Sequence, residues 1–170
     1  MKKTLHPDLL TTKDLIYKAL NFYCSTPKVE VANAEYGAYQ FTLQERRVKF
    51  RVAKITPTKI GQFVTLYKRV GKHPIQPYDA LDPFDILVIS TRRGEFFGQF
   101  VMPKPVLVQQ GILSIAGQGG KRALRVYPPW DQTSSRQAHN TQCWQLGYFL
   151  EILHNKPIDR VRAHRLYQQK

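Results

Sequence analysis

The chain has 170 residues and a mass of 19.7 kDa, and its 26 Lys and Arg residues outnumber its 12 Asp and Glu residues, which gives a formal net charge of +14. With 42% hydrophobic residues the chain can bury roughly 70% of its unfolded surface, so intrinsic disorder is excluded as a description of the whole. Its length predicts one domain over residues 1–170, and the sequence contains no run of roughly 18 apolar residues that would cross a membrane.

The cysteine count and the first residues predict the compartment. Two cysteines, Cys24 and Cys143, are typical of a reduced cytosolic protein rather than of a disulfide scaffold or a zinc module. Cys143 falls inside a predicted helix and is expected to be buried. The bases Lys2 and Lys3 are not followed by the apolar segment of a secretory signal. We therefore expect a cytoplasmic protein that does not contact membranes. The sequence predicts no particular oligomeric state.

Three helices are predicted from hydrophobic spacing and capping residues. Thr11 or Thr12 can cap the first, which ends before Pro27. The second is expected to start near Ser134 or Ser135 and to bury one apolar stripe. A C-terminal helix is expected to carry the solvated bases of the tail, namely Arg160, Arg162, Arg165 and Lys170.

Between residues 38 and 102 the hydrophobic period changes to two, which indicates strands. In residues 47–52 this alternation predicts a core face of three apolar side chains and an opposite face formed by Arg47, Lys49 and Arg51. Further strands are predicted over residues 62–67, 86–89, 96–102 and 123–127. Residues 86–89 are apolar on both faces, which is typical of a central strand, and 96–102 would be its hairpin partner. Together these elements predict an α+β (mixed α/β) domain with a single mixed sheet flanked by helices.

The excess charge is concentrated in one stretch of the sequence. Residues 46–78 contain nine bases and no acid, and the next residues, 79–95, form a small acidic island with a net charge of −2. A field of one sign on a soluble domain favours a polyanionic partner, most often nucleic acid. General solubility charge, or binding to an anionic membrane surface or another anion, are the alternatives.

The most promising ligand loop lies within this stretch, at residues 54–62. It combines two lysines, two threonines and a glycine, and so offers charge and donors where a backbone can approach a phosphate.

The glycine-rich turn before Lys121 is not a P-loop, because Arg122 stands where that motif needs a hydroxyl. The five histidines do not show the paired spacing of a helical metal site, and zinc is not expected.

The acidic island is the one place where metal-dependent phosphodiester chemistry would fit. Nucleases of the PD-(D/E)XK type place an Asp at the start of one strand and a Glu/Asp-x-Lys motif on the next, so that the carboxylates hold Mg²⁺ on the phosphate. Asp85 starts the predicted central strand, but Gln99 replaces the second carboxylate and Val101 the lysine. Glu35, Glu95 or Lys104 would have to migrate in to compensate.

The second long helix carries two amides on one face, Gln142 and Gln145. One interpretation is a core helix whose amides bond to the backbone. The other is contact with a base or a phosphate.

Several strings of the sequence are similar to the MepB family. They occur in one order across about two thirds of the chain: residues 53–69, 77–79, 98–101, 120–123 and 125–130, then Thr141-Gln142, Trp144-Gln145 and Tyr148-Phe149. Tyr67 departs from the family, which is associated with Trp there, and the change keeps an aromatic ring. The resemblance implies a bacterial, cytoplasmic protein named after a multidrug-export operon, with a restriction-endonuclease-like fold.

The sequence therefore predicts a DNA-binding protein of nuclease-like fold with a degenerate or absent catalytic centre. The expected phosphate-facing and base-facing residues are Arg51, Lys54, Thr56, Lys59, Lys68, Arg69, Lys121, Arg122, Arg125, Gln142 and Gln145. No cofactor is required by this hypothesis. The first alternative is a nuclease that uses Mg²⁺ or Mn²⁺ at Asp85 with Gln99 and Glu35. The second is a module that binds a protein or an anionic ligand.

Overall fold

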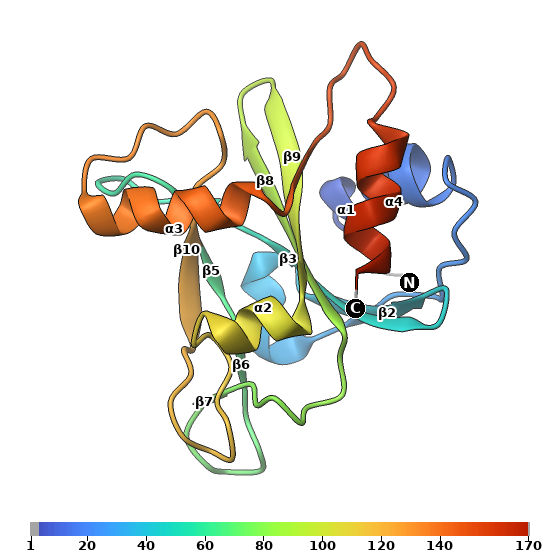
Figure 1. The fold of residues 1–170 in the computed structure, drawn as a ribbon. Helices are drawn as coiled ribbons and strands as arrows, with labels where there is room; N and C mark the ends of the chain where they lie inside the picture. The colour runs from blue at the N-terminus through green and yellow to red at the C-terminus, as the bar shows by residue number, and fades with distance from the viewer. Residues whose placement is uncertain (1–3, 170) are drawn as a thin grey trace.

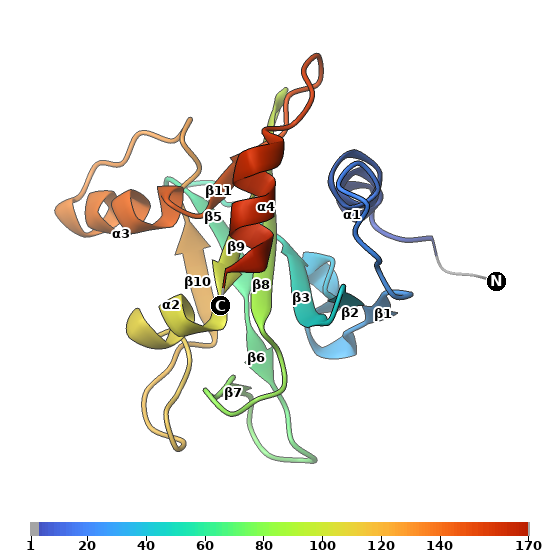
Figure 2. The same cartoon turned by 45° about the vertical axis from the view of Figure 1, so that its right-hand side comes forward.

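The computed structural model describes residues 4–169 and has a mixed α+β architecture, as the sequence predicts (Figure 1). A six-stranded mixed sheet runs through the middle of the molecule. Helices cover one of its faces, and a smaller sheet with two further helices covers the other (Figures 1 and 2). Three bases named above, Lys2, Lys3 and Lys170, lie outside the described residues.

The large sheet contains one parallel pair among antiparallel neighbours. Its spatial order is β1 (Lys28–Val29), β2 (Tyr39–Leu43), β3 (Arg46–Val52), β8 (Ile86–Arg93), β9 (Phe96–Pro103) and β11 (Phe149–Glu151). Strands β3 and β8 are parallel, with Val48 opposite Ile86. Strands β8 and β9 form a hairpin in which Ser90 lies opposite Gln99, which confirms the predicted hairpin.

Two smaller sheets accompany the large one, whereas the sequence predicted a single sheet. A three-stranded antiparallel sheet has the order β10 (Ala123–Val126), β5 (Gln62–Thr65) and β4 (Lys54–Ile55). Strands β6 (Tyr67–Lys68) and β7 (Gln76–Pro77) form a short pair. Parallel neighbours need a long crossover connection, and here that crossover supplies β4, β5, β6 and β7, while β10 comes from the chain beyond β9.

The helices are α1 (Pro7–Thr12), which continues as the π-helix η1 (Lys13–Tyr17), the 3-10 helix η2 (Val31–Tyr36), α2 (Lys104–Gln109), α3 (Arg136–Leu146) and α4 (Arg160–Gln168).

The prediction for the first cap was wrong. His6 caps α1, because its Nδ1 accepts a hydrogen bond from Asp8 N at 3.1 Å and Pro7 suits the first helical position. Within residues 4–169, none of the helices has the length and apolar composition that a membrane crossing requires.

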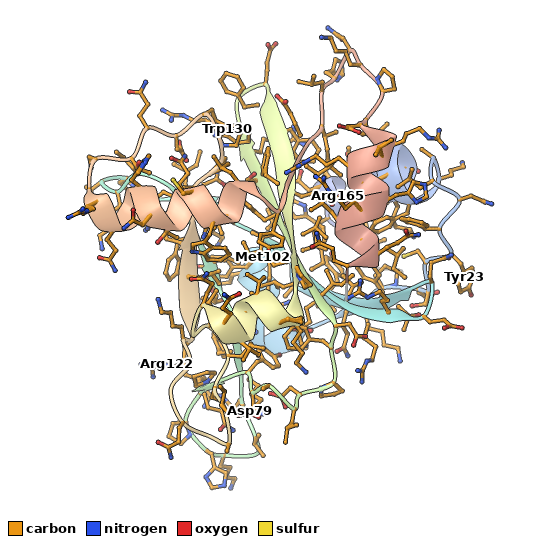
Figure 3. The ribbon with its side chains drawn as sticks, in the orientation of Figure 1. Tyr23, Asp79, Met102, Arg122, Trp130 and Arg165 are labelled. Atoms are coloured by element: carbon orange, nitrogen blue, oxygen red, sulfur yellow. The ribbon has the colours of Figure 1, made fainter. Side chains whose placement is uncertain are left out.

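Two apolar cores lie on opposite faces of the large sheet. Ile86 and Val88 face the core shared with α1, η1 and α4, whereas Leu87 and Ile89 face the core shared with α2, β5 and β10. Met102 lies in the second core, between β9 and α2 (Figure 3). The prediction that residues 86–89 form a central strand covered on both sides is therefore confirmed.

Two of the three bases on the charged face of β3 are buried, and only Arg47 is exposed. Arg51 is fully buried and Lys49 is 7% exposed, because the segment before η2 and the crossover cover this face of the strand. Both cations share one carboxylate: Lys49 Nζ lies 2.6 Å from Glu30 Oε1, and Arg51 Nη2 lies 2.5 Å from Glu30 Oε2. Burial lowers the pKa of Lys49, although Glu30 opposes that shift.

Candidate functional site

Most of the bases in residues 46–78 form ion pairs with acidic residues from other parts of the chain. Five of its nine bases form ion pairs, namely Arg47 with Asp85, Lys49 and Arg51 with Glu30, Lys54 with Glu35, and Lys68 with Asp82. The acids come from the segment before β2 and from the acidic island. The stretch is therefore not a continuous field of one sign, and the expected phosphate contacts of Arg51 and Lys68 are not available in this structure.

A groove of about 650 Å³ gathers three cations from distant parts of the chain. Its walls are residues 58–60 of the loop at residues 56–61, strand β10 with Lys121 two positions before it, and helix α3 with the two serines before it. Lys59, Lys121 and Arg125 line it, together with the hydroxyl groups of Ser134, Ser135 and Thr141. Among the described residues that line the groove, none is acidic. We call this hollow the basic groove.

The loop at residues 56–61 is fastened to β10 by Arg125. The guanidinium Nη1 donates to Thr56 Oγ1 at 3.0 Å and to the carbonyl oxygens of Ile60 and Gly61 at 3.3 and 3.2 Å. Gly61 has φ +85°, and a Cβ there would lie 2.7 Å from the ring of Tyr127. The loop thus reaches the wall of the groove only because glycine permits both the dihedral angle and the close approach. Lys59, at the tip, stays exposed.

Helix α3 forms the opposite wall and begins where the sequence predicted. Ser135 caps it by accepting a hydrogen bond from Ala138 N at 3.1 Å. Gln145 Oε1 accepts from Tyr127 N at 2.8 Å, and Gln142 Nε2 donates to the carbonyl oxygens of Pro128 and Asp131 at 3.0 and 2.8 Å. Both amides therefore hold the helix to the end of β10. Gln142 and Gln145 are buried and satisfied by the backbone, so they do not present amides to a base or a phosphate.

The third wall depends on a turn that Asp79 clamps. Asp79 Oδ2 accepts hydrogen bonds from Ser114 Oγ at 2.6 Å and from Gly117 N at 3.1 Å, and Oδ1 accepts from Leu81 N at 3.1 Å. This turn leads directly to Lys121, whose backbone N donates to Ile112 O. The Ser114 hydroxyl, followed by the two backbone donors, lowers the pKa of Asp79 to about 2.

We expect acid to release this turn before the rest of the fold. Because folding lowers the pKa of Asp79 from 3.8 to about 2, its ionised form favours the folded turn. The contribution is complete above pH 3.8 and is lost as the pH falls through about 2. Amide exchange at Gly117, followed by NMR over this range, should accelerate in step with protonation, and Asp79→Asn should show fast exchange at every pH. Exchange that stays slow in Asp79→Asn would show that the clamp does not hold the turn.

The candidate catalytic residues do not converge. Asp85 is held by Arg47, with 3.1 Å between Arg47 Nη2 and Asp85 Oδ1 and 2.7 Å between Arg47 N and Asp85 Oδ2, and the Arg47 hydrogen bond lowers the pKa of this carboxyl. Gln99 lies opposite Ser90, five positions along the strand and therefore about 16 Å away. It is fully buried, where it donates to Thr12 Oγ1 and accepts from Tyr167. Glu35 is exposed and lies 4.0 Å from Lys54. The structure therefore does not bring Asp85, Gln99 and Glu35 together.

The remaining predicted residues surround the basic groove without lining it. Arg122 and Arg69 are exposed, and Arg122 points outward at the lower edge of the molecule in Figure 3. Lys54 lies over the ring of Tyr36, with 4.6 Å between Nζ and the ring centroid. Thr56 accepts the Arg125 hydrogen bond and is therefore part of the loop anchor.

Sequence reasoning missed the wall that α3 contributes. Thr141 and Trp144 line the groove, and Tyr127 contributes an aromatic side chain beside Arg125. The helix start at Ser134 or Ser135 was predicted, but nothing in the sequence pattern indicated which face of the helix would meet the loop at residues 56–61. The order Arg125-Val126-Tyr127, with polar side chains alternating around a buried one, was the available signal for a strand with one open face.

These features define a basic mixed α+β protein with a groove suited to anions. The chain belongs to the MepB-like family, whose model matches residues 30–151, and the predicted resemblance is confirmed. A solved structure described as the crystal structure of MepB is similar to this chain at 34% sequence identity and a TM-score of 0.75, over 89% of this chain and 99% of that one. The structure of a bacterial homing endonuclease is more distantly similar, at 14% identity and a TM-score of 0.43, over 76% of this chain and 80% of that one. No curated protein matches the chain.

Proposed function

We propose that this protein binds DNA through phosphate contacts in the basic groove and does not cleave it. The observation that carries the proposal is the convergence of Lys59, Lys121 and Arg125 on one groove with no acidic lining residue among those described. Cations of this kind bind phosphates whatever the base sequence, and hydroxyl groups beside them supply further donors. The separation of Asp85, Gln99 and Glu35 supports a binding role rather than metal-dependent cleavage. The free thiols of Cys24 and Cys143 support a cytoplasmic setting.

The test removes the charges of two groove lysines that, unlike Arg125, do not fasten the loop. Lys59→Ala combined with Lys121→Ala should weaken binding to labelled duplex, measured by fluorescence anisotropy over a salt series. Each lost phosphate contact reduces the slope of log affinity against log salt by about 0.9, so the double variant should lose about 1.8. Arg125 is left in place because it fastens the loop.

The matched control removes two exposed bases of the C-terminal segment, Lys156 and Arg165, of which Arg165 lies on α4, across the large sheet from the groove (Figures 1 and 3). This control keeps the same net charge as the groove variant, and its salt slope should stay near that of the wild type. Equal slopes in the groove variant and the wild type would contradict the groove as the binding site. Binding at low salt that vanishes at physiological salt in the wild type would favour the second alternative, a protein or small anionic ligand.

A further inference from the structure

Helix α3 carries a histidine and a cysteine four residues apart on a face that the basic groove does not use. His139 and Cys143 are both exposed, and the groove is lined instead by Ala138, Thr141 and Gln145. Residues four apart on a helix lie above one another, so these two side chains meet. The sequence interpretation found neither a histidine pair nor a cysteine cluster beside the histidines, and it missed this mixed pair.

The geometry of the pair matches two ligands of one tetrahedral metal ion. Zn–S and Zn–N bonds of about 2.3 and 2.0 Å at a tetrahedral angle place the sulfur and the nitrogen about 3.5 Å apart. The separation of Cys143 Sγ and His139 Nε2 is 3.5 Å. No side-chain movement is therefore needed to bring both atoms onto one ion.

A neighbouring hydroxyl lies beside the other nitrogen of the imidazole. Thr133 Oγ1 is 3.5 Å from His139 Nδ1. In the tautomer with the proton on Nδ1, that proton can face this oxygen, and Nε2 keeps the lone pair that a metal ion would bind. Metal-binding histidines usually have such a partner, and its loss weakens metal binding.

One chain supplies only two of the four ligands that a closed zinc site needs. Among residues 4–169, no three His, Cys, Asp or Glu side chains gather closely enough to hold a metal ion. Helix α3 lies at the edge of the molecule in both Figure 1 and Figure 2, where a second copy can approach it. We propose that His139 and Cys143 form half of a Cys2His2 zinc site, which the same two residues of a second copy of this chain complete.

The chemistry of this assembly is balanced without a redox partner. Zn²⁺ binds two thiolates and two neutral imidazoles, and each cysteine releases its proton to the buffer. The two thiolates cancel the charge of the ion, so the site itself adds no charge to two basic chains. Their mutual repulsion is screened beyond about 8 Å at physiological salt. Two basic grooves would then belong to one particle, which raises its avidity for a long polyanion.

Cobalt(II) is the spectroscopic probe, because it takes the zinc geometry and shows a thiolate-to-cobalt charge-transfer band. Titrated into the reduced full-length chain at physiological salt, it should produce this band and saturate at one ion per two chains. Zinc at the same ratio should double the mass measured by sedimentation. Saturation at one ion per chain, or a mass that zinc does not change, would overturn the proposal.

Variants separate this site from adventitious binding. Cys143→Ser and His139→Gln should each lose the band and the change in mass, and Thr133→Val should lower zinc affinity roughly tenfold or more. The matched controls are Cys24→Ser and His154→Gln, which remove a half-buried cysteine and an exposed histidine from elsewhere in the fold. A full-strength band in Cys143→Ser would refute the site even if all the variants fold.

Discussion

Replacing Glu30 with alanine should destabilise the protein by about 3–5 kcal/mol, because it leaves two buried cations with no counter-charge. Lys49 and Arg51 both depend on this one carboxylate, at 2.6 and 2.5 Å, and Arg51 has no exposed surface. For a chain of this length, such a loss lowers Tm by roughly 10 °C. Urea unfolding should show a lower midpoint with an unchanged m-value.

The matched control is Glu35→Ala, in which the lost partner of Lys54 is exposed. The side chain of Glu35 is 85% exposed, and the ion pair is 4.0 Å long. This variant should stay within about 0.5 kcal/mol of the wild type. If Glu30→Ala behaved like Glu35→Ala, water would have to reach Lys49 and Arg51, and the buried cluster would be refuted.

The loss in Glu30→Ala should also depend on pH. Removing Glu30 removes the charge that opposes the lowering of the Lys49 pKa, so that pKa falls further below its unfolded value. Between the two pKa values the unfolded chain then binds the extra proton. Stability of the variant should therefore rise with pH relative to the wild type, up to the ordinary lysine range near pH 10.5.

The second large effect is expected at Gly61→Ala, with a loss of about 2–5 kcal/mol. The left-handed dihedral costs a residue with a Cβ about 1–2 kcal/mol, and forced overpacking against neighbours adds about 1–3 kcal/mol. Here the new Cβ would lie 2.7 Å from the ring of Tyr127 and 2.9 Å from the carbonyl oxygen of Val126. Chemical unfolding measures the effect directly.

Gly94→Ala separates the cost of the left-handed dihedral angle from the cost of the close contact. Gly94 has φ +59°, and a Cβ there meets nothing within 4 Å, so this variant should lose only the cost of the dihedral angle. The difference between the two variants measures the close approach of the loop to β10. Equal losses would mean that the loop moves aside freely and that Gly61 does not position Lys59.

The sequence predicted elements well where local chemistry decides them. The Ser135 cap and the β8–β9 hairpin follow from a capping hydroxyl and from alternating runs around a short turn. The prediction failed at His6, because a histidine beside Pro7 is a less common cap than a threonine. Cys143 was expected in the core, but the side of α3 on which it lies faces solvent.

Side-chain partners could not be predicted, because they come from distant segments. The alternation of β3 indicated that Lys49 and Arg51 share a face, but not that Glu30 lies against that face. The same limit explains why a stretch without acids in the sequence is mostly neutralised in space. Lys59 and Lys121 were predicted to face phosphates, and both line the groove, but their convergence with α3 depends on a crossover whose path no local pattern specifies.

The late positions of β10 and α3 in the chain have a consequence for the order in which the basic groove forms during synthesis. The hairpin of β8 and β9 needs only neighbouring residues, whereas β5 must wait for β10, and the groove must wait for α3 beyond it. A nascent or truncated chain that ends before residue 123 has every strand up to β9 but lacks two walls of the groove. The basic groove therefore forms only after α3 has been synthesised.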